Sequence, residues 1–394
     1  MEGKKLNRFY SFQPYKVKKK FPPTETEEQI QLHVQGSSYP KARSGHRIVA
    51  DNSNMYSFGG YNPHVDREDE DLLDDPYWAE SSPLFKELWK FNLTSKVWTK
   101  LHTKGKMPSQ LASHAATMIG NKLLVYGGTG VPFGSTSSND LHVCDLSTLE
   151  WSHLKTTGTP PKPLYGQGVA LYKEALYVVG GTSGYEYTMD VHKLDLHKKE
   201  WKLLPAKTTP DSRHVSYTLV YMILIPAYSL KKEQWELLQT SSDGSTENGY
   251  PMPRRCHACV QRGNEVYICG GINIDTILSD LWCLRLDLLQ WKKLPTKLST
   301  PVYFHSAALS PNGQLLVFGG VTKITTKIVH NVLNITALKR TNEIHSLWLT
   351  IPSLLEICWT ALNFYFPHLK SLPVCQLREL GIPTNLINRT EPGT

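Results

Sequence analysis

Paired glycines recur along this chain, and each pair ends a short apolar run. Four of the pairs are followed, after a variable loop, by an apolar stretch ending in tryptophan, at Trp98, Trp151, Trp201 and Trp291. The same elements return in the same order about every fifty residues, which is typical of repeat proteins assembled blade by blade. The pairs are Gly59-Gly60, Gly127-Gly128, Gly180-Gly181, Gly270-Gly271 and Gly319-Gly320.

The second copy shows what one repeat builds. Residues 114–126 contain two apolar runs joined at Gly120-Asn121, a pattern that predicts a tight antiparallel hairpin. Residues 139–146 predict a third strand, and Trp151 opens a fourth and supplies a large apolar surface. Four antiparallel strands cannot bury both faces alone, so such units close radially into a propeller.

The combination of Gly-Gly, strand, turn and Trp resembles the Kelch repeat, over about residues 40–350. The resemblance implies an all-β fold, a six-bladed Kelch β-propeller. The fourth copy is incomplete, because the short segment between Trp201 and Trp235 lacks a strand end, a Gly-Gly pair and a loop. The sixth copy carries an extra apolar and basic stretch from Lys323 to Leu338. We expect exposed strand edges to destabilise the incomplete blade.

We divide the 394 residues into a basic N-terminal arm (1–39), the propeller (40–350) and a helical tail (351–394). No apolar run reaches eighteen residues, the N-terminus lacks an apolar signal core, and the seven cysteines are irregularly spaced. We therefore expect reduced thiols and a cytoplasmic or nuclear location. Part of the net charge of +8 lies in the N-terminal arm, which predicts a solvated segment and no contact with nucleic acid or membrane.

The pattern changes from strand to helix after the propeller. Ser353 is placed to cap a helix, and Leu354, Cys358 and Leu362 recur every four residues along one face. A second short helix is predicted over residues 374–380. Periodicity leaves open the simpler interpretation, in which the first helix packs back on the propeller.

Residues 353–362 resemble the elongin-binding BC box, in which a leucine enters a pocket on elongin C and a cysteine lies at the close helix contact. The resemblance implies elongin C contacts through Leu354, Leu355, Cys358 and Leu362. Downstream, Leu372, Pro373 and Leu377 resemble a loose cullin-2 box. A Kelch propeller followed by a BC box resembles the substrate receptors of cullin-2 RING ubiquitin ligases. This implies a non-catalytic adaptor whose partners are elongin C with elongin B, cullin-2 and a RING-box protein.

The loops that lead into the blades face one mouth of the central channel. Kinship with Kelch receptors implies that the C-terminal degron of a target protein binds there. A free carboxylate needs charge-assisted partners, and an arginine fork supplies two parallel hydrogen bonds. For the arginines a pocket role and a surface role both stay open. The candidates are Arg43, Ser44, Tyr61, Ser113, Arg213, Arg254, Arg255 and Ser306.

Two other functions remain as alternatives. A Kelch scaffold that regulates a cytoskeletal or signalling partner without elongin would use the same propeller. A propeller enzyme would need a nucleophile with a base, a phosphate-binding loop or a metal cluster, and the sequence shows no such motif. Cys256 and Cys259 lack the second pair of a zinc site, and strand alternation places them on opposite faces. We expect no catalytic residue, no metal and no cofactor.

Overall fold

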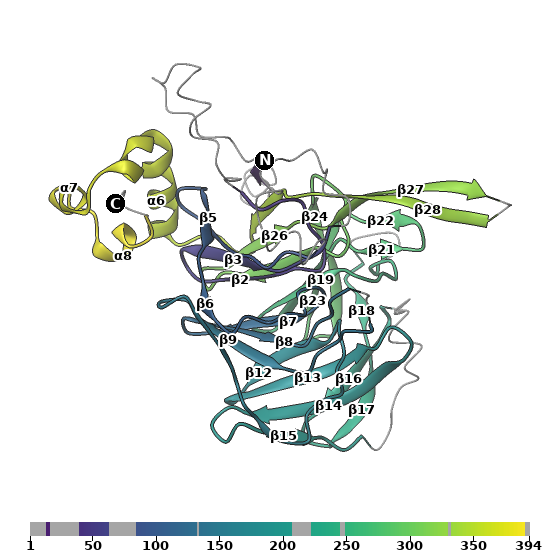
Figure 1. The fold of residues 1–394 in the computed structure, drawn as a ribbon. Helices are drawn as coiled ribbons and strands as arrows, with labels where there is room; N and C mark the ends of the chain where they lie inside the picture. The colour runs from purple at the N-terminus through teal and green to yellow at the C-terminus, as the bar shows by residue number, and fades with distance from the viewer. Residues whose placement is uncertain are drawn as a thin grey trace.

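The computed structural model describes residues 13–15, 39–62, 84–131, 134–206, 222–244, 249–329 and 332–390. They form a β-propeller with a helical tail at one side (Figure 1). This confirms the predicted all-β Kelch fold and tail, but the prediction of six blades is wrong, since the described residues form five. Within the described ranges the fourth copy gives only a two-stranded sheet, β16 (Leu224–Ser229) with β17 (Gln234–Gln239), because its segment is too short for more.

The blades are numbered here by sequence copy, and their antiparallel strands run from the channel outward. Blade 1 comprises β2 (Arg47–Ala50), β3 (Asn54–Phe58), β4 (Leu88–Asn92) and β5 (Trp98–Leu101). Blade 2 comprises β7 (Ala115–Ile119), β8 (Lys122–Tyr126), β9 (Leu141–Asp145) and β10 (Glu150–His153). Blade 3 comprises β12 (Gly168–Tyr172), β13 (Ala175–Thr182), β14 (Tyr187–Asp195) and β15 (Glu200–Leu203). Blade 5 comprises β19 (Ala258–Arg262), β20 (Glu265–Cys269), β23 (Asp280–Arg285) and β24 (Gln290–Lys297).

Blade 6 joins the two ends of the propeller sequence. Its strands are β25 (Ser306–Leu309), β26 (Gln314–Phe318), β29 (Ile344–Trp348) and, outermost, the N-terminal strand β1 (Gln13–Tyr15). Part of the predicted N-terminal arm therefore belongs to a blade. The extra stretch of this copy forms a long hairpin, β27 (Val321–Val329) and β28 (Val332–Arg340), which extends away from the blades (Figure 1).

Smaller strands complete the sheets. The parallel additions β6 (Lys104–Gly105), β11 (Thr157–Gly158) and β18 (Ser241–Ser242) lie at the outer edges of blades 2, 3 and 5. A short hairpin, β21 (Ile272–Asn273) with β22 (Thr276–Ile277), follows the glycine pair of blade 5. No helix within the described ranges is long and apolar enough to cross a membrane.

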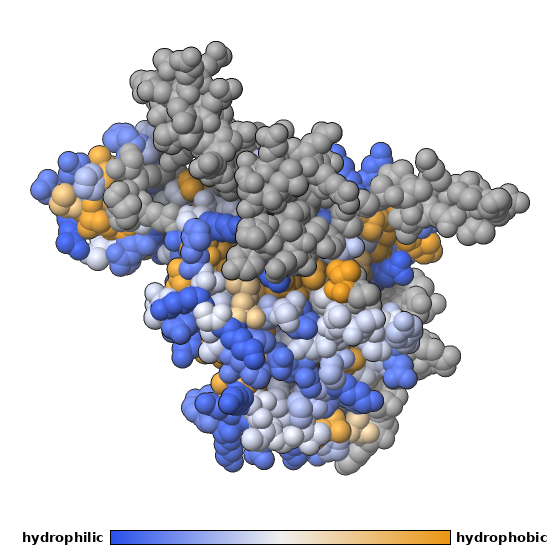
Figure 2. Space-filling model, viewed as in Figure 1, coloured by the Kyte–Doolittle hydropathy of each residue, from blue (hydrophilic) through white to orange (hydrophobic). Residues whose placement is uncertain are grey.

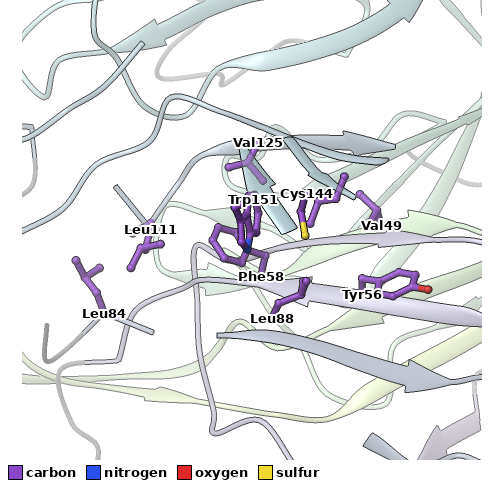
Figure 3. Close-up of a cluster of buried hydrophobic side chains, with 11 residues drawn as sticks. Val49, Tyr56, Phe58, Leu84, Leu88, Leu111, Val125, Cys144 and Trp151 are labelled. Atoms are coloured by element: carbon purple, nitrogen blue, oxygen red, sulfur yellow. The ribbon is translucent and has the colours of Figure 1, made fainter. Parts of the chain in front are cut away.

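The recurring tryptophans pack each blade against the one before it. Trp151 of blade 2 lies 4.8 Å, between ring centroids, from Phe58 of blade 1, within a buried cluster that both sheets supply (Figure 3). Trp98 meets Phe318 of blade 6 in the same way, at 5.1 Å. Trp98, Trp151 and Trp201 each contact the aromatic residue that directly precedes a glycine pair, which links these elements of the repeat in space.

The incomplete fourth copy leaves apolar side chains of blade 3 in contact with solvent. On the innermost strand β12, Leu171 and Tyr172 are exposed, whereas Val49 and Ala50 at the corresponding end of β2 are buried between blades. Trp235 of the fourth copy still packs on blade 3, in a cluster with Met189. That the fourth copy is a weak point of the fold stays a prediction.

Four residues precede the innermost strand of each blade, and we call each group a mouth tetrad. The third residue of each tetrad has a positive φ. The backbone amides of Gly166, Ser113, Gly45 and Phe304 donate in turn to the carbonyls of Ser113, Gly45, Phe304 and Cys256, at 2.7–3.1 Å. This hydrogen-bonded belt lines the mouth of the channel. The tetrads are residues 43–46, 111–114, 164–167, 254–257 and 302–305.

The fourth tetrad residue is a wedge between neighbouring blades, and it is histidine in all tetrads but one. A Cβ added to Gly59 would lie 3.0 Å from Cε1 of His114 in the next blade. A Cβ added to Gly60 would lie 3.0 Å from Cβ of His46 in its own blade. The pairs Gly59-Gly60, Gly270-Gly271 and Gly319-Gly320 thus each leave room for two imidazoles. In blade 3 Gln167 takes the position of the histidine.

These wedges make stability depend on pH. Burial lowers the pKa of His114 and His305 to about 3 and that of His46 well below its ordinary value. Between about pH 6.5 and 3 the unfolded chain binds protons that the folded chain does not, so the free energy of unfolding falls as the pH falls, by up to about 1.4 kcal/mol per pH unit for each histidine. Urea unfolding between pH 7 and 5 measures this slope.

The variant His114→Gln, which gives blade 2 the wedge residue of blade 3, should have a shallower slope than the unmutated chain. The reciprocal variant Gln167→His should have a steeper one. Parallel curves for all three proteins would contradict the assignment of these side chains as buried neutral wedges.

Candidate functional site

Two of the predicted mouth arginines lie in the interior of their blades. Arg43 is fully buried, donates to the Gly59 carbonyl at 3.0 Å and pairs with Glu87 at 2.9 Å. Arg254 repeats this arrangement: it donates to the Gly270 carbonyl at 3.1 Å and holds both carboxylate oxygens of Asp280 at 2.6 and 2.9 Å. Their donors serve their own blades, so we do not assign either arginine to ligand binding.

The sequence carries a signal for this internal role. The indoles of Trp89 and Trp282 donate to the carboxylates that hold Arg43 and Arg254, at 2.8 and 2.7 Å. In the three other blades the first tetrad residue is apolar, and histidine replaces this tryptophan. The apolar residue and histidine are Leu111 with His142, Leu164 with His192, and Val302 with His345. Arginine and tryptophan therefore occur together, as parts of one buried network.

The predicted serines differ in their surroundings. Ser306 is buried and its hydroxyl accepts a hydrogen bond from the Ile48 amide at 3.0 Å, which ties blade 6 to blade 1. Ser113 is half-buried in the belt, and Ser44 lies beside it at the mouth. The remaining candidate, Arg213, lies outside the described residues.

A different arginine completes the mouth. Arg340, the last residue of the long hairpin, donates from Nε to the Ser44 hydroxyl at 2.9 Å. Its guanidinium carbon lies 5.2 Å from the centroid of the Tyr61 ring. Partial burial lowers the pKa of Arg340. Electrostatic interactions with Tyr61 and Tyr303 act in the opposite direction and raise it. Two predicted residues, Ser44 and Tyr61, are thus brought together with one that the sequence argument missed, because the extra stretch had no counterpart in other copies.

Arg47 brings a second unpredicted charge below the mouth. Its Nη1 donates to the neighbouring His46 carbonyl at 3.0 Å, and among the described residues it has no ion pair. Burial lowers its pKa, and the Cys256 thiol of blade 5 acts in the opposite direction. The exposed Arg255 lies in that blade, beside Cys256. A comparison of repeats would have found Arg47, because the residue after the tetrad is small in every other blade.

The mouth therefore combines positive charge with aromatic surface. Arg340, Arg255 and Arg47 contribute three guanidinium groups. Tyr303 and Phe304 stack with ring centroids 5.2 Å apart, and Phe304 is exposed. Such a site favours an anionic group joined to an apolar or planar one, because arginine forks bind carboxylates and aromatic faces bury apolar surface.

A buried cysteine and histidine lie close enough to suggest a nucleophile and base. Sγ of Cys269 is 3.6 Å from Nε2 of His305. Burial raises the pKa of this thiol to about 12 and lowers that of the imidazole to about 3, so both groups are neutral. Since the thiolate is the nucleophile, this pair is an unreactive part of the core.

The tail docks on the side of blades 1 and 6. It contains α6 (Leu354–Tyr365), η1 (Pro367–Ser371), α7 (Val374–Glu379) and α8 (Thr384–Ile387). As predicted, Ser353 caps α6 by accepting from the Glu356 amide. The Glu356 carboxylate pairs with Arg389 and accepts from Asn312 of blade 6, and the Trp359 indole donates to Thr94 of blade 1.

The opposite face of α6 is open to solvent. Leu354 is 75% exposed, Leu355 43%, and Cys358 is also exposed. Hydrophobic residues gather on the surface of the tail in Figure 2. The simpler interpretation therefore holds for one face of the helix: the face with Glu356 and Trp359 packs on the propeller, while the face with Leu354 and Cys358 is exposed.

The other predicted tail contacts are less accessible. Leu377 is fully buried with Leu369 and Ile387 in a small core of the tail, and Leu362 and Leu372 pack against it. Their first role is to hold the short helices together. Pro373 is exposed.

Comparison with known proteins gives the same architecture. Residues 24–225 match the KLHDC2/KLHL20/DRC7 Kelch-repeats domain, and residues 253–298 match the Kelch motif. The chain therefore belongs to the Kelch-repeat family. It is 42% identical over 380 residues to Kelch domain-containing protein 10 of Xenopus tropicalis, across 90% of this chain and 87% of that protein. The human Kelch domain-containing protein 10 is 41% identical over 381 residues, across 90% and 81%.

A more distant relative is Kelch domain-containing protein 2 of Bos taurus. It is 27% identical over 293 residues, across 72% of this chain and 64% of that protein. Its identity to this chain is lower than that of the two Kelch domain-containing protein 10 sequences.

The two neighbouring arginines of blade 5 give a direct test of the site assignment. Arg254→Ala removes a buried guanidinium and leaves Asp280 without its partner, so we expect the free energy of unfolding to fall by about 3 kcal/mol. Arg255→Ala, one residue away on the surface, should change it by less than about 0.5 kcal/mol. Urea denaturation of both variants checks this. Equal losses would mean that Arg254 is not an internal tie.

Proposed function

We propose that this protein is the substrate-recognition subunit of a cullin-2 RING ubiquitin ligase. The observation that carries the proposal is the split character of α6. One face anchors the helix to the propeller, and the other offers Leu354, Leu355 and Cys358 to a partner. In a BC box the leucine and cysteine must reach elongin C, so an exposed stripe on an anchored helix is the geometry that the function needs.

Anchoring improves such a contact. An isolated twelve-residue helix is marginal in water, and a partner would have to order it on binding. Here the cap at Ser353 and the contacts of Glu356 and Trp359 fix the helix beforehand. The exposed Pro373 stays in the proposal as the cullin-2 contact, while the buried Leu377 supports that segment from below.

The mouth supports the second half of the proposal, which is capture of the C-terminal degron of a target protein. Arg340, with Ser44 and Tyr61, offers a guanidinium beside a hydroxyl and an aromatic ring. The exposed Arg255 of blade 5 and Arg47 of blade 1 add positive charge. A terminal carboxylate provides the charge that these groups need, and the last side chains would lie against Tyr303 and Phe304.

The tail assignment predicts loss of elongin binding from single substitutions. Leu354→Ser and Cys358→Phe should each abolish co-purification with elongins B and C, because one empties a pocket contact and the other blocks a close helix approach. Thermal unfolding should hardly change, since both positions are exposed. Phe364→Ser, an equally exposed change outside the motif, is the matched control. Retained elongin binding in both variants would contradict the assignment of α6 as the elongin site, and no elongin binding by the unmutated chain would favour a Kelch scaffold without elongin.

The mouth assignment predicts discrimination between acid and amide. Peptides that vary in their last two residues should bind only with a free carboxyl end, in calorimetric or fluorescence titrations. Arg340→Ala should weaken binding about tenfold or more, because a hydrogen bond between charged groups contributes about 1.5–3 kcal/mol. The neighbouring exposed Lys339→Ala is the control. Equal affinity for amidated peptides would rule out carboxylate capture.

A further inference from the structure

Blade 3 contains a cavity at the position where blades 1 and 5 hold a buried arginine. Its volume is about 340 Å³, and its lining includes Leu164, Gly180, Asp190 and His192. In sequence order these are the counterparts of Arg43, Gly59, Glu87 and Trp89 in blade 1. We propose that this cavity, the blade 3 socket, binds the guanidinium of an arginine side chain from a partner polypeptide.

The backbones of the two blades coincide at this point. A Cβ added to Gly60 would lie 3.3 Å from Cβ of Arg43, and one added to Gly181 would lie 3.2 Å from Cβ of Leu164. Leu164 therefore starts from the place where Arg43 starts. The Leu164 side chain is shorter than that of Arg43 and does not reach the carboxylate of Asp190. The space that the Arg43 guanidinium fills in blade 1 is therefore the socket in blade 3.

The acceptors that hold a guanidinium are retained. In blades 1 and 5 the arginine binds the carbonyl of the first glycine and the carboxylate of an acidic residue on the next strand. In blade 3 the first glycine is Gly180 and the acid is Asp190. Strand pairing of Val179 with Val191 brings these two to neighbouring positions.

Asp190 differs from its counterparts because it has no ion-pair partner in the part of the chain that the structure describes. In blade 2 Asp140 pairs with His153 at 3.2 Å, and in blade 6 Glu343 accepts from Thr300 at 2.9 Å. In blade 3 the apolar Leu203 stands at the position of His153, so it cannot neutralise the carboxylate.

The remaining lining fits a planar cation. His192 is only 6% exposed. Within the described ranges its ring has no hydrogen-bond partner. Burial lowers its pKa, so it lines the socket as a neutral ring. The charged side chains at the rim are two carboxylates, Asp190 and Glu186, and one ammonium, Lys162. In blade 1 the Arg43 guanidinium lies 4.1 Å above the Phe85 ring, and Tyr187 offers an aromatic surface at the socket.

The test uses a peptide blocked at both ends, acetyl-Gly-Arg-Gly-amide, and its twin with citrulline in place of arginine. Saturation-transfer NMR on the full chain should show the arginine peptide binding at least about tenfold more tightly than the neutral twin, as expected for a charged hydrogen-bond pair. Because neither peptide has a free carboxylate, the result is independent of the proposed degron site. Equal binding of the two peptides would overturn the proposal.

Two variants locate the binding. Asp190→Asn removes the charge at an exposed position and should abolish the preference for arginine. Leu164→Arg should fill the socket from within, as in blades 1 and 5, and should block the peptide while raising the melting temperature. Glu150→Gln, at an exposed carboxylate in blade 2, is the control. If Leu164→Arg does not fold, Asp190→Asn decides alone. Arginine binding that persists in Asp190→Asn would disprove the socket.

Discussion

The propeller depends on the contact between a glycine pair and the wedge residues of two blades. The first glycine faces the imidazole of the next blade, and the second faces the imidazole of its own blade. Neither position has room for a Cβ, and φ values of 68° and 108° at Gly59 and Gly60 are ones that other residues rarely adopt. The same turn that ends a strand therefore sets the spacing between blades. The fourth copy lacks such a pair, and its described residues form only the two-stranded sheet of β16 and β17.

This contact also decides which polar groups can serve a ligand. The first and fourth tetrad residues point into the blades, where Arg43 and Arg254 tie strands together and the histidines separate sheets. The second and third positions supply the exposed Arg255 and Phe304 at the mouth. An arginine at the first position is thus structural, and one at the second position, such as Arg255, is available. Arg254 and Arg255 are adjacent in the sequence, yet the first ties strands inside the blade and the second is available to a ligand.

Much of the fold could be predicted from the sequence, because glycine pairs, turns and tryptophans are local signals repeated in order. The helix cap at Ser353 was predictable for the same reason. The interior role of Arg43 was less evident, since residue type alone does not give the direction of a side chain. The position of Arg340 could not be predicted, because it depends on how a hairpin unique to one copy returns to the mouth. Arg47 could have been found by aligning the copies, where it stands among small residues.

The alternation of strand direction separates the two candidate binding surfaces. The tetrads precede the first strand of each blade and therefore lie at one end of the sheets. Thr94 and Asn312, which hold α6, lie in turns after an odd number of strands, at the other end. A partner on the tail thus leaves the mouth open, and the long hairpin that carries Arg340 extends on the side away from the tail (Figure 1). An adaptor that joins two proteins needs this separation, because each partner must bind without displacing the other. The same antiparallel order that builds the blades provides it.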